Sequence, residues 1–255
     1  MLYYKSLEVM FMKVNKKGLI VAAFLTIVLA VIVIYSKGFE QVLYRFFSSK
    51  NEEGSRTLLA VYFFEHLWMV LLSSLIAIVL GTSIGIFITT SYGREFKELL
   101  LKTVNLGQAF PSPALLALAV PILGYGIKGA LIALVIYILM PIVYNVVIGI
   151  EEVPKDIVDA AKGMGMSEVE VYRKVKIPLA LNVILGGIRT ALVINISATT
   201  LAATVGAGGL GVLVVNGVKT FDMVLILEGV IPVTLLAIIV ELLLKTLQQR
   251  LIWNA

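Results

Sequence analysis

Long apolar segments constrain the fold of this chain more than any other feature. Six segments carry few charged residues, and each reaches the roughly 18 residues that mark a helix able to cross a bilayer. They are residues 18–35, 67–90, 103–123, 127–150, 179–205 and 222–244. Since the chain of 255 residues is also 60% hydrophobic, these segments predict an all-α integral membrane protein with six transmembrane helices.

Lysine and arginine residues are unevenly shared between the two sets of loops. Six spans place both termini on one side, and the loops and termini of that side hold 14 Lys and Arg residues against 6 on the other side. Basic loops mark the cytoplasmic side of a membrane protein. The sequence therefore predicts cytoplasmic N- and C-termini, and the net charge of +5 needs no nucleic-acid partner to explain it.

Two residue types that build most metal and redox sites are scarce. Cysteine is absent, which excludes disulfide bonds and thiolate chemistry. His66 is the single histidine, so most multi-histidine metal sites are excluded and no metal site is predicted. We expect His66 to be an interfacial residue at the membrane edge.

Three functional classes suit a chain with these spans: the membrane subunit of a primary importer, an ion-coupled transporter or channel, and an intramembrane enzyme. The enzyme class is disfavoured because H-E-x-x-H and a pair of aspartates within the spans are both missing. An ion-coupled transporter usually shows internal repeats and carboxylates near the midplane, for which Glu228 alone gives little support. No Walker A sequence occurs, so ATP-driven transport would need a separate ATPase subunit.

The segment between the first two spans divides the chain into two predicted units. Residues 36–65 mix balanced charges with aromatic side chains, a pattern typical of a segment lying along the membrane interface. We therefore expect residues 1–63 to form an N-terminal cytoplasmic segment, an added first span and an interfacial joint. Residues 64–255 form the main membrane domain in this interpretation.

A polar stretch at residues 151–178 separates the fourth and fifth spans, and its first half has the pattern of a short helix. Pro154 suits the first turn of a helix, where its missing N–H is not needed. Gly163 and Gly165 are predicted to end this helix in a turn.

The second half of this stretch has the pattern of another short helix. Ser167 and Glu170 are spaced as a capping box, and Pro178 is predicted to end the helix. Ala160 and Ala161 in the first helix have small side chains that let another surface approach closely. We favour a surface that docks to a partner protein over a simple linker, because a linker needs no capping box.

This stretch resembles a known motif. Residues 159–165, Asp-Ala-Ala-Lys-Gly-Met-Gly, followed by Ile-Pro-Leu at residues 177–179, are similar to the coupling motif of binding-protein-dependent ABC importer permeases. Asp159 stands where that family has Glu, which keeps the charge. The resemblance implies a type I importer fold, with one added N-terminal span before a five-helix core. It also implies that the loop contacts a separate ATPase through Asp159, Ala160, Ala161, Gly163, Gly165 and Pro178.

Three further segments resemble the branch of this family that imports quaternary-ammonium osmoprotectants such as glycine betaine, carnitine and choline. They are residues 108–118, 187–191 and 203–211. The resemblance implies a prokaryotic cell membrane, an ATPase dimer that binds ATP and Mg, an extracytoplasmic substrate-binding protein, and a second permease, identical or related. It implies no cofactor on this chain. A permease for an amino acid or an oxyanion is the alternative within the family, and an ion-coupled transporter is the alternative outside it.

Two segments are candidates for the translocation path. Prolines interrupt the third span beside Gln108, Phe110 and Pro111, so this segment either borders the path or is a packing kink. Polar residues Ser197, Thr200 and Thr204 share one face of the fifth span. That face suits either a path or a seam of small residues between helices.

The last candidate functional residues are two charged residues in the last two spans and a glycine cluster between those spans. Arg189 and Glu228 lie inside predicted spans, where an unpaired charge is costly, so we hypothesise that they interact. Residues 206–211 fit G-x-G-x-x-G, but no strand precedes them and no soluble βαβ unit surrounds them. We interpret them as a flexible turn on the outer side rather than as a dinucleotide site.

Overall fold

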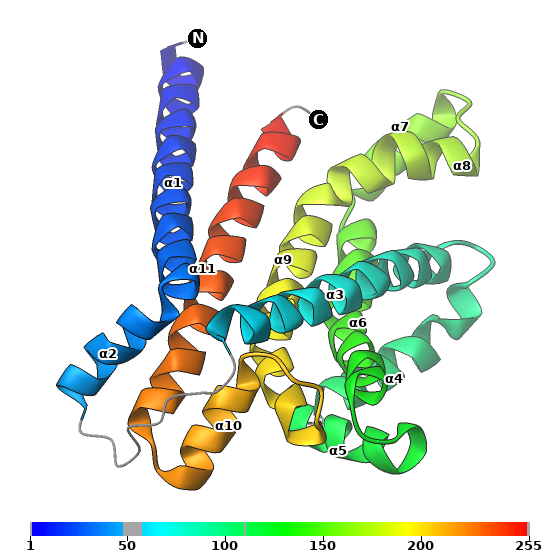
Figure 1. Ribbon diagram of the computed structural model, residues 1–255. Coiled ribbons are helices and arrows are strands. Elements are labelled where there is room, and N and C mark those ends of the chain that lie inside the picture. The colour runs from blue at the N-terminus through cyan, green and yellow to red at the C-terminus, as the bar shows by residue number, and fades with distance from the viewer. Residues whose placement is uncertain (1, 48–57, 110, 254–255) are drawn as a thin grey trace.

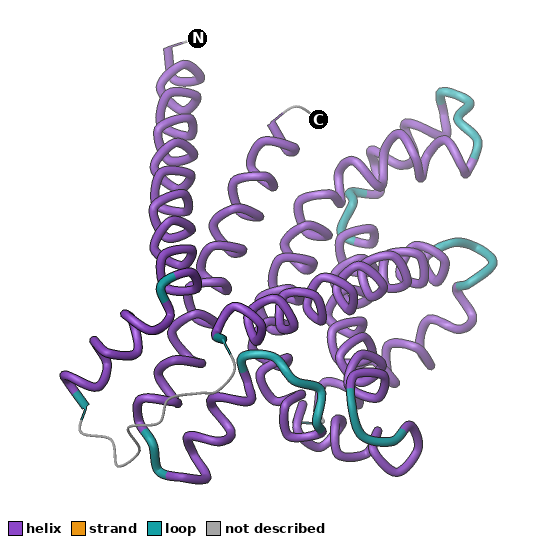
Figure 2. Tube along the Cα trace, viewed as in Figure 1, coloured by secondary structure: helices purple, strands orange, loops and turns teal. Residues whose placement is uncertain are grey.

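The protein is a bundle of helices in a computed structural model that describes residues 2–47, 58–109 and 111–253 (Figure 1). Helices form all the regular secondary structure of these residues (Figure 2). In chain order they are α1 Leu2–Ile34, α2 Ser36–Phe46, α3 Leu59–Thr89, the 3₁₀ helix η1 Arg94–Phe96, α4 Lys97–Ala109, α5 Ser112–Leu123, α6 Ile127–Glu151, α7 Lys155–Gly163, α8 Glu168–Val171, the π-helix η2 Tyr172–Lys176, α9 Ile177–Leu201, the 3₁₀ helix η3 Ala202–Val205, α10 Gly211–Thr220 and α11 Met223–Trp253.

Five helical segments of the described chain are long and apolar enough to cross a membrane. They are Lys17–Ile34, Leu59–Thr89, Ile127–Glu151, Glu168–Val205 and Met223–Leu251. They correspond to the first, second, fourth, fifth and sixth predicted spans.

The third predicted span is not one continuous helix, in keeping with the prolines predicted to interrupt it. The structure has α4 and α5 there, and α5, with 12 residues, is about 18 Å long against a hydrocarbon core of about 30 Å. Pro111 has an extended conformation (ψ 138°) at the start of α5, which separates the two helices. Proline lacks the N–H that a continuous helix requires.

Pro178 does not end a helix, contrary to the prediction. The chain is helical without a break from Glu168 to Val205. A π-turn lies just before the proline, where Ile177 N–H donates to the Tyr172 carbonyl five residues earlier. This change of hydrogen-bond register lets the helix continue past a residue that cannot donate.

The core of the bundle forms where α3, α6 and α9 pack against one another. Close approach of α3 and α6 depends on two glycines, because a Cβ added at Gly81 would lie 2.8 Å from Ile142 Cγ2 and one at Gly85 would lie 2.6 Å from Val146 Cβ. Such close contact is the usual reason for small residues at helix interfaces in membranes. These three helices therefore form the frame that positions the other elements.

The N-terminal helix packs along the last helix of the chain (Figure 1). Leu29 and Val33 of α1 join one apolar cluster with Leu236 of α11. Near the middle of α1, a Cβ at Gly18 would lie 3.5 Å from Thr246 Oγ1, so the two helices are antiparallel. This packing places both ends of the chain at the same end of the molecule (Figure 1).

The segment predicted as an interfacial joint, residues 36–65, holds α2 and the start of α3, and its residues 48–57 lie outside the described residues. Ser36–Phe46 forms the separate helix α2, which has only Leu43 as a buried residue. Residues from Leu59 onward already belong to α3, which is 31 residues long. His66 in that helix is 0% exposed, and its Nε2 lies 3.2 Å from the Ile196 carbonyl oxygen. The expected interfacial position of His66 is therefore wrong, since α9 covers its ring.

The glycine cluster at residues 206–211 forms a turn, but the turn is tightly packed and not flexible as predicted. Gly208 and Gly209 have φ angles of +89° and +75°, which suit glycine alone among common residues. Gly209 N–H donates to Glu65 Oε2 at 2.9 Å. A Cβ at Gly208 would lie 2.6 Å from that same oxygen, so the chain itself fills the space beside the turn.

Candidate coupling surface and translocation face

The loop between α6 and α9 carries α7 and α8 at the end of the bundle where both chain termini lie (Figure 1). α7 begins at Lys155, directly after Pro154, which precedes the first turn rather than lying in it. α7 is strongly amphipathic: Ala161 is buried and most of its other residues are exposed. The loop is therefore a folded projection with one side against the bundle and one side open.

Gly165 ends α7 in a turn that only glycine fits without strain. Its φ angle is +84°. Met166 N–H donates to the Ala161 carbonyl at 3.2 Å, and Gly165 N–H donates to the Lys162 carbonyl at 2.9 Å. This pair of bonds is a Schellman motif, which satisfies carbonyl groups that the helix end leaves free. The predicted glycine turn is present.

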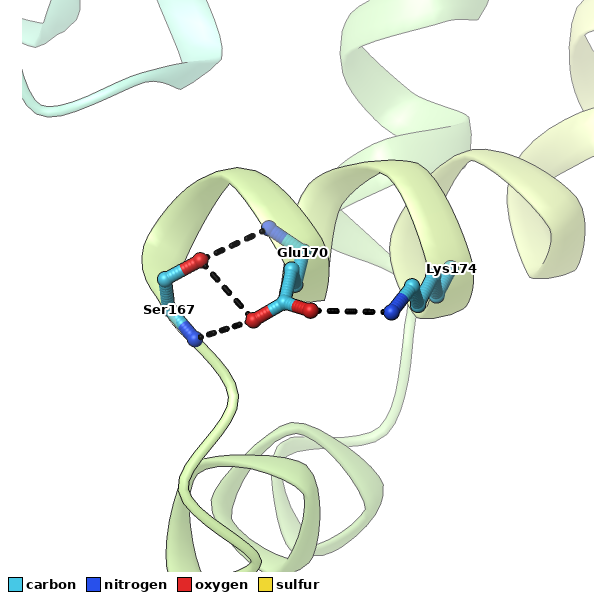
Figure 3. A network of polar contacts seen from close by, with 3 residues as sticks. All are labelled: Ser167, Glu170 and Lys174. Atoms are coloured by element: carbon cyan, nitrogen blue, oxygen red, sulfur yellow. Dashed lines mark hydrogen bonds and ion pairs between the residues drawn. The ribbon is translucent and has the colours of Figure 1, made fainter.

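The capping box predicted at the start of α8 is confirmed (Figure 3). Ser167 Oγ accepts a hydrogen bond from Glu170 N–H at 3.4 Å, and Glu170 Oε2 accepts one from Ser167 N–H at 3.1 Å. Lys174 Nζ lies 2.8 Å from the other carboxylate oxygen. The Lys174 ammonium, followed by the Ser167 donors, lowers the pKa of Glu170 to about 2. The carboxylate is therefore held in its charged form.

Side-chain bonds tie this loop to the end of α3. The Tyr172 hydroxyl donates to the Thr89 carbonyl, and Ser91 Oγ donates to Glu168 Oε2 at 3.2 Å. Val171 beneath them is 2% exposed. The loop is therefore bonded to the end of α3 as well as continuous with α9.

A third tie joins the loop to the element that follows α3. Lys97 at the start of α4 forms an ion pair with Glu151 at the end of α6. Because α3, α4, α6 and α9 all meet at this end, the loop is fixed to four helices of the main domain.

The open side of the loop exposes apolar side chains. Ile157, Met164 and Val169 are 42%, 72% and 74% exposed. Gly163 is exposed on the same loop, and a Cβ added there would meet nothing within 4 Å. Glycine in a helix is less favourable than alanine by about 1 kcal/mol. The fold of this chain therefore gives no reason for glycine at residue 163.

The structure divides the residues predicted to contact an ATPase into two groups. Asp159, Ala160, Gly163 and Gly165 are exposed on the loop. Ala161 is 2% exposed and faces the bundle, so its role here is to seat α7. Pro178 is exposed but lies in α9, beyond the two short helices.

Two candidates for the translocation path meet at a hollow of about 260 Å³ on the surface of α9. Ser112 at the start of α5 and Ser197 of α9 both line it, together with Tyr137 of α6. The proline-rich segment and the polar face of the fifth span are thus neighbours, although 85 residues separate the two serines in sequence. This meeting point supports the path interpretation of both segments.

The remaining path candidates are placed less closely around the hollow. Pro111 is exposed directly before α5, and Thr204 is exposed in η3, directly after α9. Thr200 is half-buried. Phe110 lies outside the described residues, and of Gln108 only the backbone, in α4, is described.

The hypothesis that Arg189 interacts with Glu228 is wrong. Arg189 Nε lies 3.4 Å from Glu241 Oε1 of α11. Glu228 is 4% exposed at the other end of α11, and the charged groups that act on it are the acidic Glu40 and Asp222. The sequence analysis missed Glu241. Residues 189 and 241 are each 12 positions from the ends of α9 and α11 near the coupling loop, but the predicted span ends at 179 and 244 hid this equal depth.

Comparison with known proteins identifies the family. Residues 77–253 match the binding-protein-dependent transport system inner membrane component. The chain belongs to this family. It is therefore a non-catalytic, multi-pass inner-membrane component of a binding-protein-dependent ABC transporter, and the family implies an ATPase and a binding protein as partners.

Relatives of this permease can be named. The carnitine transport permease protein OpuCB of Listeria monocytogenes is 41% identical over 188 residues, which cover 72% of this chain and 85% of that relative. The glycine betaine/carnitine/choline transport system permease protein OpuCB of Bacillus subtilis is 36% identical over 186 residues, which cover 73% of this chain and 85% of that relative.

Among solved structures, this permease is similar to a chain of the MetNI methionine ABC transporter in an inward-facing conformation. The TM-score is 0.70, the sequence identity is 19%, and the match covers 78% of this chain and 99% of that chain. This likeness shows the type I permease fold of the membrane domain.

Proposed function

We propose that this permease forms the membrane path of an ATP-driven importer for osmoprotectants with a quaternary ammonium group, such as carnitine, glycine betaine and choline. The solute class comes from the transport functions for which the two OpuCB relatives are named. The observation that carries the coupling role is the exposed loop surface, which holds the apolar side chains of Ile157, Met164 and Val169 and open space beside Gly163.

The partners follow from this role. A dimer of ATPase subunits binds ATP and Mg and contacts α7 and α8, so this chain needs no cofactor of its own. An extracytoplasmic substrate-binding protein delivers the solute to the opposite end. A second permease, identical or related, completes the path. Both termini lie in the cytoplasm with the coupling loop, in agreement with their position at one end of the molecule (Figure 1).

Residues 64–255 are the permease domain in this proposal. Residues 1–63 add a span and the helix α2 to its flank.

The continuous helix from Glu168 to Val205 explains how nucleotide-driven motion would reach the path. Its 38 residues correspond to about 55 Å at 1.5 Å per residue. One end carries the capping box at Ser167, and the other end borders the glycine turn at residues 206–211. Closure of an ATPase dimer would therefore tilt α9 as a rigid body. Ser197 and the hollow lie on the side of α9 that faces the path.

Co-purification tests this function directly. The tagged permease would be extracted in mild detergent, and the proteins that purify with it would be identified by mass spectrometry. We expect an ATPase and an exported substrate-binding protein, and that binding protein should bind glycine betaine, carnitine or choline. A permease that purifies alone and transports in liposomes without ATP would contradict the proposal.

A further inference from the structure

An ion pair lies half-way along two helices, at the surface of the chain. The side chains of Arg189 in α9 and Glu241 in α11 are 26% and 39% exposed. Each residue is 12 positions from the end of its helix near the coupling loop, Ile177 and Trp253 respectively, and so about 18 Å from that end. Both residues lie within helical segments long and apolar enough to cross a membrane, so the pair belongs to the half of the spans nearer the coupling loop.

The face that carries this pair does not suit contact with lipid. Charged side chains within the membrane face a bundle interior or a water-filled cavity, because exposure to hydrocarbon is costly. The added helix α1 does not cover the pair, since it packs beside Thr246, about 140° around α11 from Glu241. The pair therefore faces water or protein inside the assembled transporter.

Polar contacts continue from the pair toward the coupling loop. Gln248 Nε2 of α11 donates to Asn182 Oδ1 of α9 at 2.8 Å and to its carbonyl oxygen at 2.9 Å. These residues lie seven positions, or about two turns, from Glu241 and Arg189 on the same two helices. The contacts Arg189–Glu241 and Asn182–Gln248 thus form a polar seam between α9 and α11.

The seam also continues toward the hollow on α9. Val193, one turn beyond Arg189, lines the hollow together with Ser197 and Tyr137. Thr190, next to Arg189, is exposed. One side of α9 therefore offers an open surface from the hollow, past the ion pair, to the end that carries the coupling loop.

We propose that Arg189 and Glu241 are solute-binding groups of the inner half of the path, which select solutes that carry both a carboxylate and a quaternary ammonium group. This inference rests on the proposed function and assigns a site to it. The guanidinium binds the solute carboxylate, and the Glu241 carboxylate binds the ammonium group. The 3.4 Å contact of the pair is longer than the about 2.7–2.9 Å of a strong charge-assisted bond. A zwitterion can therefore replace each partner without leaving either charge unpaired.

Two solutes separate this role from a structural ion pair. Glycine betaine carries both charges, whereas choline carries the ammonium group and no carboxylate. In liposomes that contain the complete importer, we expect Arg189→Gln to lower glycine betaine uptake about tenfold more than choline uptake. Glu241→Gln should lower both uptakes alike, because both solutes carry the cation. Arg189→Lys should restore part of the glycine betaine uptake.

The double variant Arg189→Gln/Glu241→Gln gives the opposing test. If the pair only holds α9 to α11, removing both charges should restore transport of both solutes, and that recovery would overturn the inference. An unchanged ratio of the two uptakes in Arg189→Gln would overturn it too. ATP hydrolysis stimulated by the loaded binding protein should persist in each variant, which shows that the complex is assembled. A native importer that takes up neither solute would refute the proposed function, and this inference with it.

Discussion

Glycines mark two turns at opposite ends of this protein, and they do so for opposite reasons. At the outer turn, a Cβ on Gly211 would lie 1.8 Å from the Thr200 carbonyl oxygen, and one on Gly209 would lie 3.0 Å from Met69 Cε. At the coupling loop, a Cβ on Gly163 would meet nothing. The outer glycines are required by the chain itself, whereas Gly163 leaves open space that we propose the ATPase fills.

The largest expected effect is at the outer turn. Gly211→Ala places a methyl group inside the contact distance of the α9 backbone, which cannot move aside as a flexible side chain can. We expect it to lower the free energy of unfolding by about 3 kcal/mol, at the upper end of the usual cost of overpacking. Thermal unfolding of the purified permease in detergent measures this, with Gly163→Ala as the matched control that should show no loss. Equal stability of the two variants would remove the distinction between the turns.

The next largest effect is on transport, with no change in stability. Gly163→Asp adds a charged side chain where the fold has room, so insertion and thermal unfolding should stay as in the native chain. We expect ATP-dependent uptake to fall at least about tenfold, within the usual range of coupling energies between sites. Native uptake by this variant would mean that no partner approaches Gly163.

Gly165→Ala should have a smaller effect that acts through the backbone. Its φ angle of +84° strains any residue with a Cβ by about 1–2 kcal/mol, yet no atom lies within 4 Å of the added methyl group. We expect the Schellman turn to loosen and the amides of Gly165 and Met166 to exchange faster. Gly165→Asn is the control, since asparagine tolerates this conformation better. Unchanged exchange in Gly165→Ala would show that this turn does not need glycine.

The capping box should give the smallest effects. Ser167→Ala removes one cap and should cost about 1 kcal/mol of local helix stability, read from hydrogen exchange of the α8 amides. Faster exchange confined to α8 is the expected pattern. Exchange that spreads through the transmembrane part of α9 would contradict a local role.

The same box predicts a pH dependence. The pKa of Glu170 is lowered from 4.5 to about 2. The stabilisation of α8 by the Glu170 carboxylate is therefore complete above about pH 4.5 and is lost as the pH falls toward 2. Protection of the α8 amides should therefore weaken across that window. Glu170→Gln should abolish the dependence, and its persistence in that variant would assign it to another group.

Much of this architecture follows from local patterns in the sequence. Five of the predicted spans are helices, and the Ser167–Glu170 capping box is present, because apolar length and cap spacing act within a few turns. Pro178 was misread because a π-turn absorbs the missing donor, and nothing in the local pattern announces such a turn. The outer glycine turn was misread because its constraint comes from Glu65, 144 residues away in sequence.

The candidate sites show the same division. The loop that carries Gly163 could be located from its motif, but whether a glycine faces open space or a neighbour depends on packing. The partner of Arg189 was missed because the sequence does not show which residues of α9 and α11 lie at the same level in the bundle. Glu241 is recognised as the partner only in the folded structure. Contacts between distant segments therefore account for most of what the sequence left open.

Binding of the ATPase to Gly163 variants tests the central claim most directly. The permease in lipid nanodiscs would be mixed with its purified ATPase, and the affinity would be measured for the native chain, Gly163→Ala and Gly163→Asp. We predict that both variants fold as the native chain does, and that affinity falls progressively from glycine to alanine to aspartate. Equal affinity of all three would contradict the claim that this glycine reserves space for the ATPase.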